Sequence, residues 1–219
     1  MGPAAQRKGF FISVEGGDGA GKSTQISRLA ESLRATGREV ILTREPGGSQ
    51  GAESIRKLLV EGAADRWSPL TEALLMYAAR ADHLERTILP ALATGAIVVT
   101  DRFADSTMAY QGIAGALGAE TVGALHDCVV GENDPDLTLI LDISPDEGLS
   151  RAGARDGAEE GRFEAKGADF QKRVREAFLE IARAAPQRCV VIDAAGGPDE
   201  VAARVLKAVR EKLPALFKD

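Results

Sequence analysis

Residues 10–24 read FFISVEGGDGAGKST, and this stretch decides the fold. It opens with an apolar, partly β-branched run, which predicts a buried strand. A glycine-rich turn follows, and after it apolar residues recur at i, i+3, i+4 and i+7, the spacing of an amphipathic helix. The stretch therefore predicts a strand, a tight turn and a helix in direct succession. The apolar residues of the helix are Ile26, Leu29, Ala30 and Leu33.

The turn fits G-x-x-x-x-G-K-[ST], the phosphate-binding loop, and ends in Lys22 and Ser23. Glycines let backbone N–H groups close around an anion, and the N-terminus of the following helix adds its positive dipole end. Lys22 supplies a charge for the β- and γ-phosphates, and the Ser23 hydroxyl is a ligand for Mg²⁺. The residues expected around ATP are Gly16, Gly17, Asp18, Gly19, Ala20, Gly21, Lys22, Ser23 and Thr24.

Two alternatives compete for this loop. A dinucleotide-binding fold needs G-x-G-x-x-G, but Gly17, Gly19 and Gly21 are spaced G-x-G-x-G, so that interpretation fails. A glycine turn without a ligand is the other alternative, and the predicted strand before it and helix after it make this the weaker interpretation.

The composition favours one α/β domain, which we expect over residues 9–219 after a loose tail at residues 1–8. Hydrophobic residues make up 44% of the chain, but no apolar run reaches the length of a membrane helix, and no secretion signal is evident. Two scattered cysteines indicate a reducing compartment, so we expect a cytoplasmic protein. A formal charge of −6 without a run of Lys or Arg argues against nucleic acid as the main partner.

Four more apolar, β-branched runs follow the first, and helical material separates each from the next. We expect all of them to be buried on both faces, which predicts a doubly wound, five-stranded parallel sheet flanked by helices, as in P-loop NTPases. Ligands of such sheets bind beyond the carboxyl ends of the strands, where charged residues gather in this sequence. The four runs are residues 40–43, 96–100, 137–143 and 189–192.

Apolar periodicity predicts the main helices. One covers residues 70–88 and ends before Pro90, another covers residues 168–184, and the last follows Pro198. Between residues 149 and 167 the chain is rich in Gly, Ala and charge, which predicts a small mobile lid, with an ordinary solvated loop as the alternative. The buried stripes expected for the three helices are Leu70, Leu74, Tyr77, Ala81 and Leu84; Phe170, Val174, Phe178 and Ile181; and Val201, Val205 and Val209.

Charged residues at the strand ends are the candidates for phosphoryl transfer, which needs positioned cations and Mg²⁺. Arg102 directly follows a strand and can grip an oxyanion with two N–H groups. Asp101 can hold Mg²⁺ or orient Arg102, although a structural ion pair is an equal alternative. Arg44 ends the second predicted strand. Arginines of the predicted lid can neutralise charge on the transferred group, and these are Arg151, Arg155 and Arg162.

Several further motifs make the chain resemble thymidylate kinases. VEGGDGAGKST, LTREPGG, ALLMYAAR, DRFADSTMAYQG, PDLTLILD and GRFE occur in the order of that family, from about residue 10 to residue 195. TREPGG and DR…S-x-x-A-Y-Q-G are far more specific than the phosphate-binding loop. The resemblance implies an Mg²⁺-dependent transfer of the γ-phosphate of ATP to dTMP by a homodimer.

The resemblance also implies roles for single residues. Asp18 matches the carboxylate near the sugar 3′-hydroxyl of the acceptor, Arg102 matches the arginine on the acceptor phosphate, and Arg44 is a further phosphate contact. At the base, Arg80 matches the arginine that hydrogen-bonds thymine and Thr107 reads the other edge. Tyr110 crowds the 2′ position, which favours deoxyribose, and Gln111 follows in the same wall.

The sequence departs from the family at some of these positions. Met76 stands where a base-stacking aromatic residue is common, and Phe103 replaces the usual Tyr or His. The loop carries no basic residue between Gly16 and Gly21, which resembles the bacterial type with its assisting arginine in the lid and favours Arg151 and Arg155.

Alternatives remain open at this point. For Arg80, an exposed salt bridge to Glu72 or Asp82 is comparable to a role at the base. Another P-loop nucleotide or nucleoside kinase would keep the fold and the loop, and a non-catalytic ATP-binding regulator is a third class. A GTP-dependent switch is excluded, because its N-K-x-D element is missing.

Overall fold

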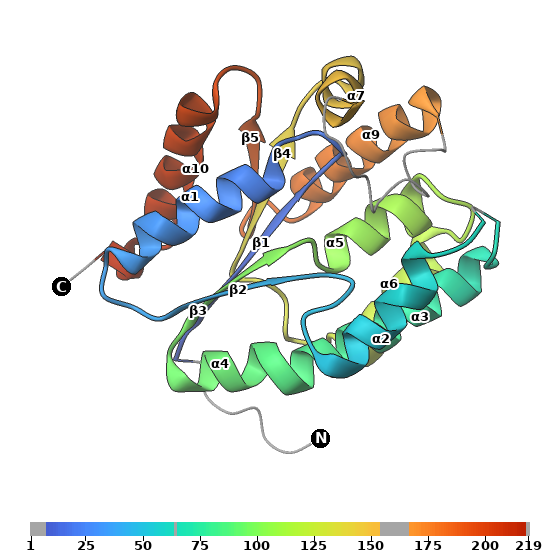
Figure 1. Ribbon diagram of the computed structural model, residues 1–219, viewed down its shortest axis with the longest axis horizontal. Coiled ribbons are helices and arrows are strands. Elements are labelled where there is room, and N and C mark those ends of the chain that lie inside the picture. Colours follow the sequence, from blue (N-terminus) through green and yellow to red (C-terminus); the bar gives the residue numbers. More distant parts are fainter. Residues whose placement is uncertain (1–7, 64, 154–166, 218–219) are drawn as a thin grey trace.

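The computed structural model describes residues 8–63, 65–153 and 167–217 (Figure 1). Its centre is one five-stranded, wholly parallel sheet in the order β2-β3-β1-β4-β5. This confirms the predicted doubly wound architecture. The tail expected at residues 1–8 lies almost entirely outside the described residues.

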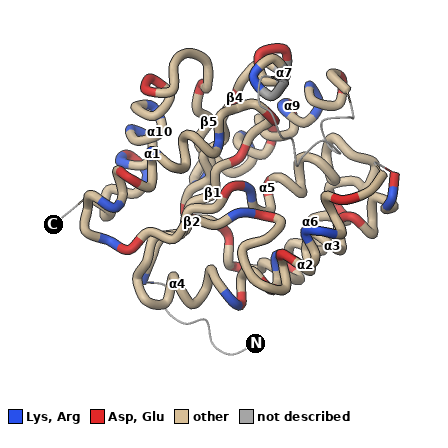
Figure 2. Tube along the Cα trace, in the orientation of Figure 1, with Lys and Arg blue, Asp and Glu red and all other residues tan. Residues whose placement is uncertain are grey.

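The five strands form where the apolar runs predicted them. Because every strand is parallel, all carboxyl ends meet at one edge of the sheet, and the charged residues that end each run gather there. Figure 2 shows basic and acidic residues close together where the chain leaves β1 and enters the segment before α5. The strands are β1 (Phe10–Gly16), β2 (Val40–Arg44), β3 (Ile97–Asp101), β4 (Leu137–Asp142) and β5 (Cys189–Asp193).

Burial on both faces, predicted for all strands, is wrong for the two at the edges of the sheet. Leu42 of β2 is 40% exposed and Val191 of β5 is 41% exposed. An edge strand has a neighbour on one side only, so the flanking helices do not cover its outer residues fully. The three inner strands are buried as predicted.

Helices α1 (Lys22–Arg34) and α10 (Pro198–Lys212) cover one face of the sheet, side by side in Figure 1. Both present the predicted apolar stripes to a core that includes Ile12, Val99 and Leu139. A short 3-10 helix, η3 (Pro214–Phe217), closes this layer with Leu216.

The opposite face carries the helices that build the site. Helix α9 (Ala168–Ala184) buries its predicted stripe against β4 and β5. Next to it lie α5 (Ala104–Thr107) and its π-helical continuation η2 (Met108–Ile113). Helices α2 (Gln50–Val60), α3 (Pro69–His83) and α6 (Ala119–Val129) form the outer part of this side (Figure 1).

Two expectations for the helix at residues 70–88 are wrong. Leu70 and Leu74 are 46% and 48% exposed, whereas Tyr77 and Arg80 of α3 are buried. The helical path also continues past Pro90, through the π-helix η1 (Leu84–Ile88) and α4 (Leu89–Thr94). Pro90 stands in the first turn of α4, directly after the π-helix η1.

Helix α7 (Pro145–Gly153) includes the start of the predicted lid. Residues 154–166, the main part of that prediction, lie outside the described residues. No helix in the described part of the chain is both long and apolar enough to span a membrane.

Candidate functional site

The loop between β1 and α1 has the geometry that its glycines predict. Gly21 caps α1 with a φ of 85°, in the left-handed region that glycine adopts without strain. A Cβ on Gly19 would lie 1.9 Å from the Gly148 carbonyl oxygen, so α7 packs directly on the loop. Lys22 Nζ donates to the Gly17 carbonyl at 3.1 Å. The ammonium thus lies inside the loop, at the N-terminus of α1.

Ser23 and Asp101 meet at the carboxyl end of β3. The Ser23 hydroxyl donates to Asp101 Oδ2 at 3.5 Å, and Oδ1 is buried without a hydrogen-bond partner among the described residues. A buried acceptor without a donor is suited to a cation or an ordered water. Among the described residues no group of three or more His, Cys, Asp or Glu could hold a metal.

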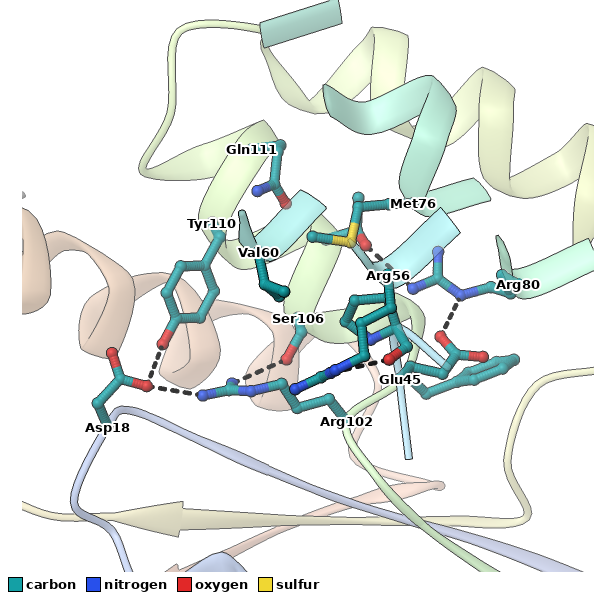
Figure 3. A pocket seen from close by; sticks show the side chains of 13 residues that line it. Asp18, Glu45, Arg56, Val60, Met76, Arg80, Arg102, Ser106, Tyr110 and Gln111 are labelled. Carbon is teal, nitrogen blue, oxygen red and sulfur yellow. Dashed lines mark hydrogen bonds and ion pairs between the residues drawn. The ribbon is translucent and has the colours of Figure 1, made fainter. Parts of the chain in front are cut away.

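A pocket opens beside the loop and collects most of the predicted acceptor residues (Figure 3). At one end Arg102 Nη2 donates to Asp18 Oδ1 at 2.8 Å, and the Tyr110 hydroxyl lies 3.4 Å from the same oxygen. The Arg102 guanidinium also lies over the Tyr110 ring, 5.2 Å from its centroid. The lining residues are Asp18, Glu45, Pro46, Arg56, Val60, Met76, Arg80, Arg102, Phe103, Ser106, Thr107, Tyr110 and Gln111.

Arg80 occupies the other end of the pocket. Its Nε donates to Glu45 at 2.8 Å and its Nη2 donates to Thr107 at 3.0 Å, while Nη1 has no hydrogen-bond partner in the described chain. The guanidinium lies between the rings of Tyr77 and Phe103, 4.6 Å and 5.2 Å from their centroids. The exposed salt bridge that the sequence left open for Arg80 is therefore wrong, since the side chain is buried and pairs with Glu45.

Met76 and Gln111 line the wall between these two ends. Met76 precedes Arg80 by one helical turn, so the two side chains share a face of α3. Gln111 donates from Nε2 to buried Glu72 at 2.9 Å, and this fixes the orientation of its amide. Glu72, offered by the sequence as a partner of Arg80, instead holds Gln111.

Arg44 does not line this pocket. It is half exposed and pairs with Glu53 at 3.3 Å. Glu53 in turn accepts from the Gly48 amide, which holds the pKa of Glu53 below its usual value. The additional cation of the pocket is Arg56 of α2, which donates to the Pro46 carbonyl at 2.8 Å. The sequence offered no signal for Arg56.

Three further acidic or basic groups lie at the pocket or behind it, and the sequence did not predict their contacts. Glu45 and His83 pair at 3.0 Å. Glu15 is fully buried beneath the turn that carries Arg102. Burial raises the pKa of Glu15 from 4.5 to about 8, and the neighbouring Asp105 carboxylate adds to this increase.

Arg151 is the one predicted lid arginine in the described residues. It donates to the Ala194 carbonyl at 3.1 Å and to Glu147 at 2.5 Å, so it ties α7 to the loop after β5. Arg155 and Arg162 lie outside the described residues.

Comparison with known proteins points to one family. A family profile described as thymidylate kinase matches residues 14–205. The chain is 61% identical over 206 residues to a thymidylate kinase of Caulobacter vibrioides, covering 94% of this chain and 98% of that protein. It is 54% identical over 201 residues to one of Ruegeria pomeroyi, covering 92% and 94%. A crystal structure of thymidylate kinase from Ehrlichia chaffeensis superposes with a TM-score of 0.74 at 36% identity, over 92% of this chain and 98% of that one.

Proposed function

The chain belongs to the thymidylate kinase family, which transfers the γ-phosphate of ATP to dTMP, and from this premise we propose how its residues divide the reaction. The products are ADP and dTDP, and the reaction contributes to dTTP synthesis. A different nucleotide kinase is not favoured. The observation that carries the proposal is the pocket beside the phosphate-binding loop that has arginines at both ends.

We assign the acceptor phosphate to the end of the pocket at Arg102 and Arg56. Arg102 adjoins the loop, where the donor phosphates bind in this fold, so an acceptor phosphate held there faces the γ-phosphate. In the described conformation the Arg102 guanidinium forms an ion pair with the Asp18 carboxylate. An incoming phosphate would compete for those N–H groups and leave Asp18 for the sugar 3′-hydroxyl. The ring of Tyr110 walls the sugar and favours deoxyribose.

The thymine ring is assigned to the end at Arg80. Within the described part of the chain Arg80 Nη1 is a buried donor without a partner, and such a group is costly unless an acceptor arrives. A thymine carbonyl supplies that acceptor. Thr107 reads the other edge of the base, and Met76 contacts the ring through its polarizable sulfur.

ATP is assigned to the loop residues Gly16 to Thr24, with Lys22 between the β- and γ-phosphates. Ser23 and Asp101 would hold Mg²⁺, and the orphaned oxygen of Asp101 supports that assignment. When bound, the ion neutralises charge on the transferred group and fixes the phosphate geometry. No general base is needed, because a phosphate monoester is largely ionised at neutral pH.

We propose Arg155 as the arginine that approaches the transferred phosphoryl group, with Arg162 as the alternative. The contacts of Arg151 with the loop after β5 give it a bracing role instead. An arginine supplied in this way to GTPases contributes about 10³–10⁵ in rate.

A homodimer is proposed through the paired helices α2 and α3. Leu58, Leu70 and Leu74 are large apolar side chains that stay exposed on these helices. A second copy of the chain would cover them. We propose a cytoplasmic location, supported by the two free cysteines, Cys128 and Cys189.

The assignment is tested by ADP release with ATP, Mg²⁺ and each of dTMP, dUMP, dCMP, dGMP, AMP and thymidine. Strong turnover with dTMP, weaker turnover with dUMP and little with the others is expected. One methyl group is worth only about 1–3 kcal/mol of discrimination, so dUMP is expected to have the turnover nearest to that of dTMP. Preference for another monophosphate would contradict the roles given to Arg80, Thr107 and Tyr110.

A further inference from the structure

Glu15, near the end of β1, is a fully buried carboxyl that the proposed reaction does not use. Its Oε1 accepts from the Phe103 amide at 2.7 Å, and its Oε2 accepts from the Ser106 hydroxyl at 2.5 Å. Both partners lie in the segment that follows β3. The carboxyl therefore ties the end of β1 to the turn that leaves the neighbouring strand.

That turn presents Arg102 to the pocket. Arg102 has a φ of 67°, in the left-handed region that residues other than glycine rarely adopt. Its amide donates to the Val14 carbonyl at 3.1 Å, and its carbonyl accepts from the Thr100 hydroxyl at 2.9 Å. Such a conformation persists only where the surroundings hold it. Glu15 holds the amide of the very next residue, Phe103.

Ser106 extends the connection to the guanidinium itself. Its hydroxyl donates to Glu15. The same hydroxyl accepts from Arg102 Nη1 at 3.1 Å (Figure 3). One carboxyl thus restrains Arg102 at two points, through the peptide that follows it and through the hydroxyl that contacts its guanidinium.

We propose that Glu15 is a positioning residue for the acceptor phosphate, because it holds the turn after β3 so that Arg102 projects into the pocket. The inference rests on the phosphate-binding role proposed above for Arg102. Glu15 does not line the pocket, so it acts through Arg102 and Ser106.

Glu15 can perform this role without a charge. Burial and the Asp105 carboxylate raise the pKa of Glu15 to about 8, against the opposing effects of Ser106 and Arg102. A neutral carboxyl still accepts from the Phe103 amide, and its other oxygen still reaches Ser106. A glutamine side chain offers the same two contacts, so Glu15→Gln keeps the restraints and Glu15→Ala removes them.

Steady-state kinetics of the full chain with ATP, Mg²⁺ and dTMP tests this role. Glu15→Ala is expected to raise KM for dTMP about tenfold and to leave KM for ATP within about twofold, as for a misplaced binding group. Glu15→Gln is expected to keep the wild-type KM for dTMP. Ser13→Ala is the matched control, since Ser13 is equally buried on β1 but pairs with Thr138 at 2.9 Å. That control should lower thermal stability without a selective effect on dTMP.

A double-mutant cycle separates positioning from general destabilisation. If Glu15 acts through Arg102, Glu15→Ala adds no increase in KM for dTMP once Arg102 is alanine. An unchanged KM in Glu15→Ala, or an equal increase in both backgrounds, would overturn the inference. Should Glu15→Ala fail to fold, Ser106→Ala removes the restraint on the guanidinium while the Phe103 contact remains, and an unchanged KM for dTMP there would overturn the part of the inference that runs through Ser106. If Arg102→Ala alone leaves KM for dTMP unchanged, the phosphate-binding role of Arg102 fails first.

Discussion

Arg80 and Glu45 form a buried ion pair in which Arg80 Nε donates to Glu45 Oε2 at 2.8 Å and the side chains are 2% and 4% exposed. The other oxygen of Glu45 lies 3.0 Å from His83 Nδ1, and Thr107 accepts from Arg80 Nη2. The guanidinium cannot rotate without breaking these hydrogen bonds. In the proposed role of Arg80, Nη1 is therefore the nitrogen that would meet the base of the acceptor.

Glu45→Gln should weaken recognition of thymine. The amide replaces one of two acceptor oxygens by a donor, so either Arg80 or His83 loses its partner, at a cost of about 1–3 kcal/mol in the free energy of unfolding. A looser Arg80 should lower kcat/KM for dTMP about tenfold and narrow the preference for dTMP over dCMP. Urea unfolding and kinetics with both acceptors measure these effects.

Glu53→Gln is the control for that variant. Glu53 also pairs with an arginine, Arg44, but the Glu53 side chain is 42% exposed. It should leave the ratio of dTMP to dCMP turnover unchanged. If both variants showed a similarly reduced preference for dTMP over dCMP, the geometry of Arg80 would not depend on Glu45.

Arg102→Ala and Arg102→Gly should differ in stability but agree in kinetics. Both remove the guanidinium, so each is expected to raise KM for dTMP about 10- to 100-fold. The φ of 67° suits glycine, so Arg102→Gly should be about 1 kcal/mol more stable than Arg102→Ala in urea unfolding. Equal stability would mean that the alanine variant relaxes out of the left-handed region.

The sequence predicted the parts of the fold that depend on local chemistry. The phosphate-binding loop, the five strands and the stripes of α1, α9 and α10 follow from residue type and spacing over a few turns. The buried stripe expected at Leu70 and Leu74 was wrong. Helical spacing of apolar side chains does not reveal whether the core of the same chain or a second protein surface covers them.

The candidate site was predicted less completely. Motifs marked the residues that line the pocket, but not the residues that hold them. Glu45 meets Arg80 across 35 residues of sequence, and Glu15 meets Phe103 across 88. Such partners are set by which strands and helices pack together in the fold, and periodicity carries no information about that.

Asp101→Asn should weaken the binding of Mg²⁺ at the proposed ion site. The amide keeps one oxygen but loses the charge, so the Mg²⁺ concentration for half-maximal rate is expected to rise about tenfold. Initial rates at fixed ATP and varied free Mg²⁺ measure it. Asp193→Asn, at the exposed end of β5, is the control. An unchanged Mg²⁺ dependence in Asp101→Asn would remove Asp101 from the proposed ion site.

The raised pKa of Glu15 should appear in the pH dependence of stability. The folded state holds this proton up to a pH of about 8, whereas the unfolded chain releases it near the ordinary value of 4.5. Folded protein therefore binds more protons between these values, and the contribution of Glu15 to stability falls as pH rises, by at most about 1.4 kcal/mol per pH unit. Above about 8 that contribution is constant.

Glu15→Gln removes this titration. Its free energy of unfolding, measured in urea at several pH values from 5 to 8, should gain on the wild type as pH increases. Parallel profiles for the two proteins would show that Glu15 ionises normally in the folded state.

Leu70→Glu and Leu74→Glu should separate the proposed homodimer. The two leucines lie one turn apart on α3 and are 46% and 48% exposed, so a charge there costs the monomer little but would be buried at an interface. Sedimentation velocity should show wild-type dimers and monomers of the double variant, with unchanged melting of the monomer core. Val191→Glu alters an equally exposed residue on the edge strand β5 and should leave the dimer intact. If the wild type sediments as a monomer at every concentration, the exposed leucines of α2 and α3 do not form this interface.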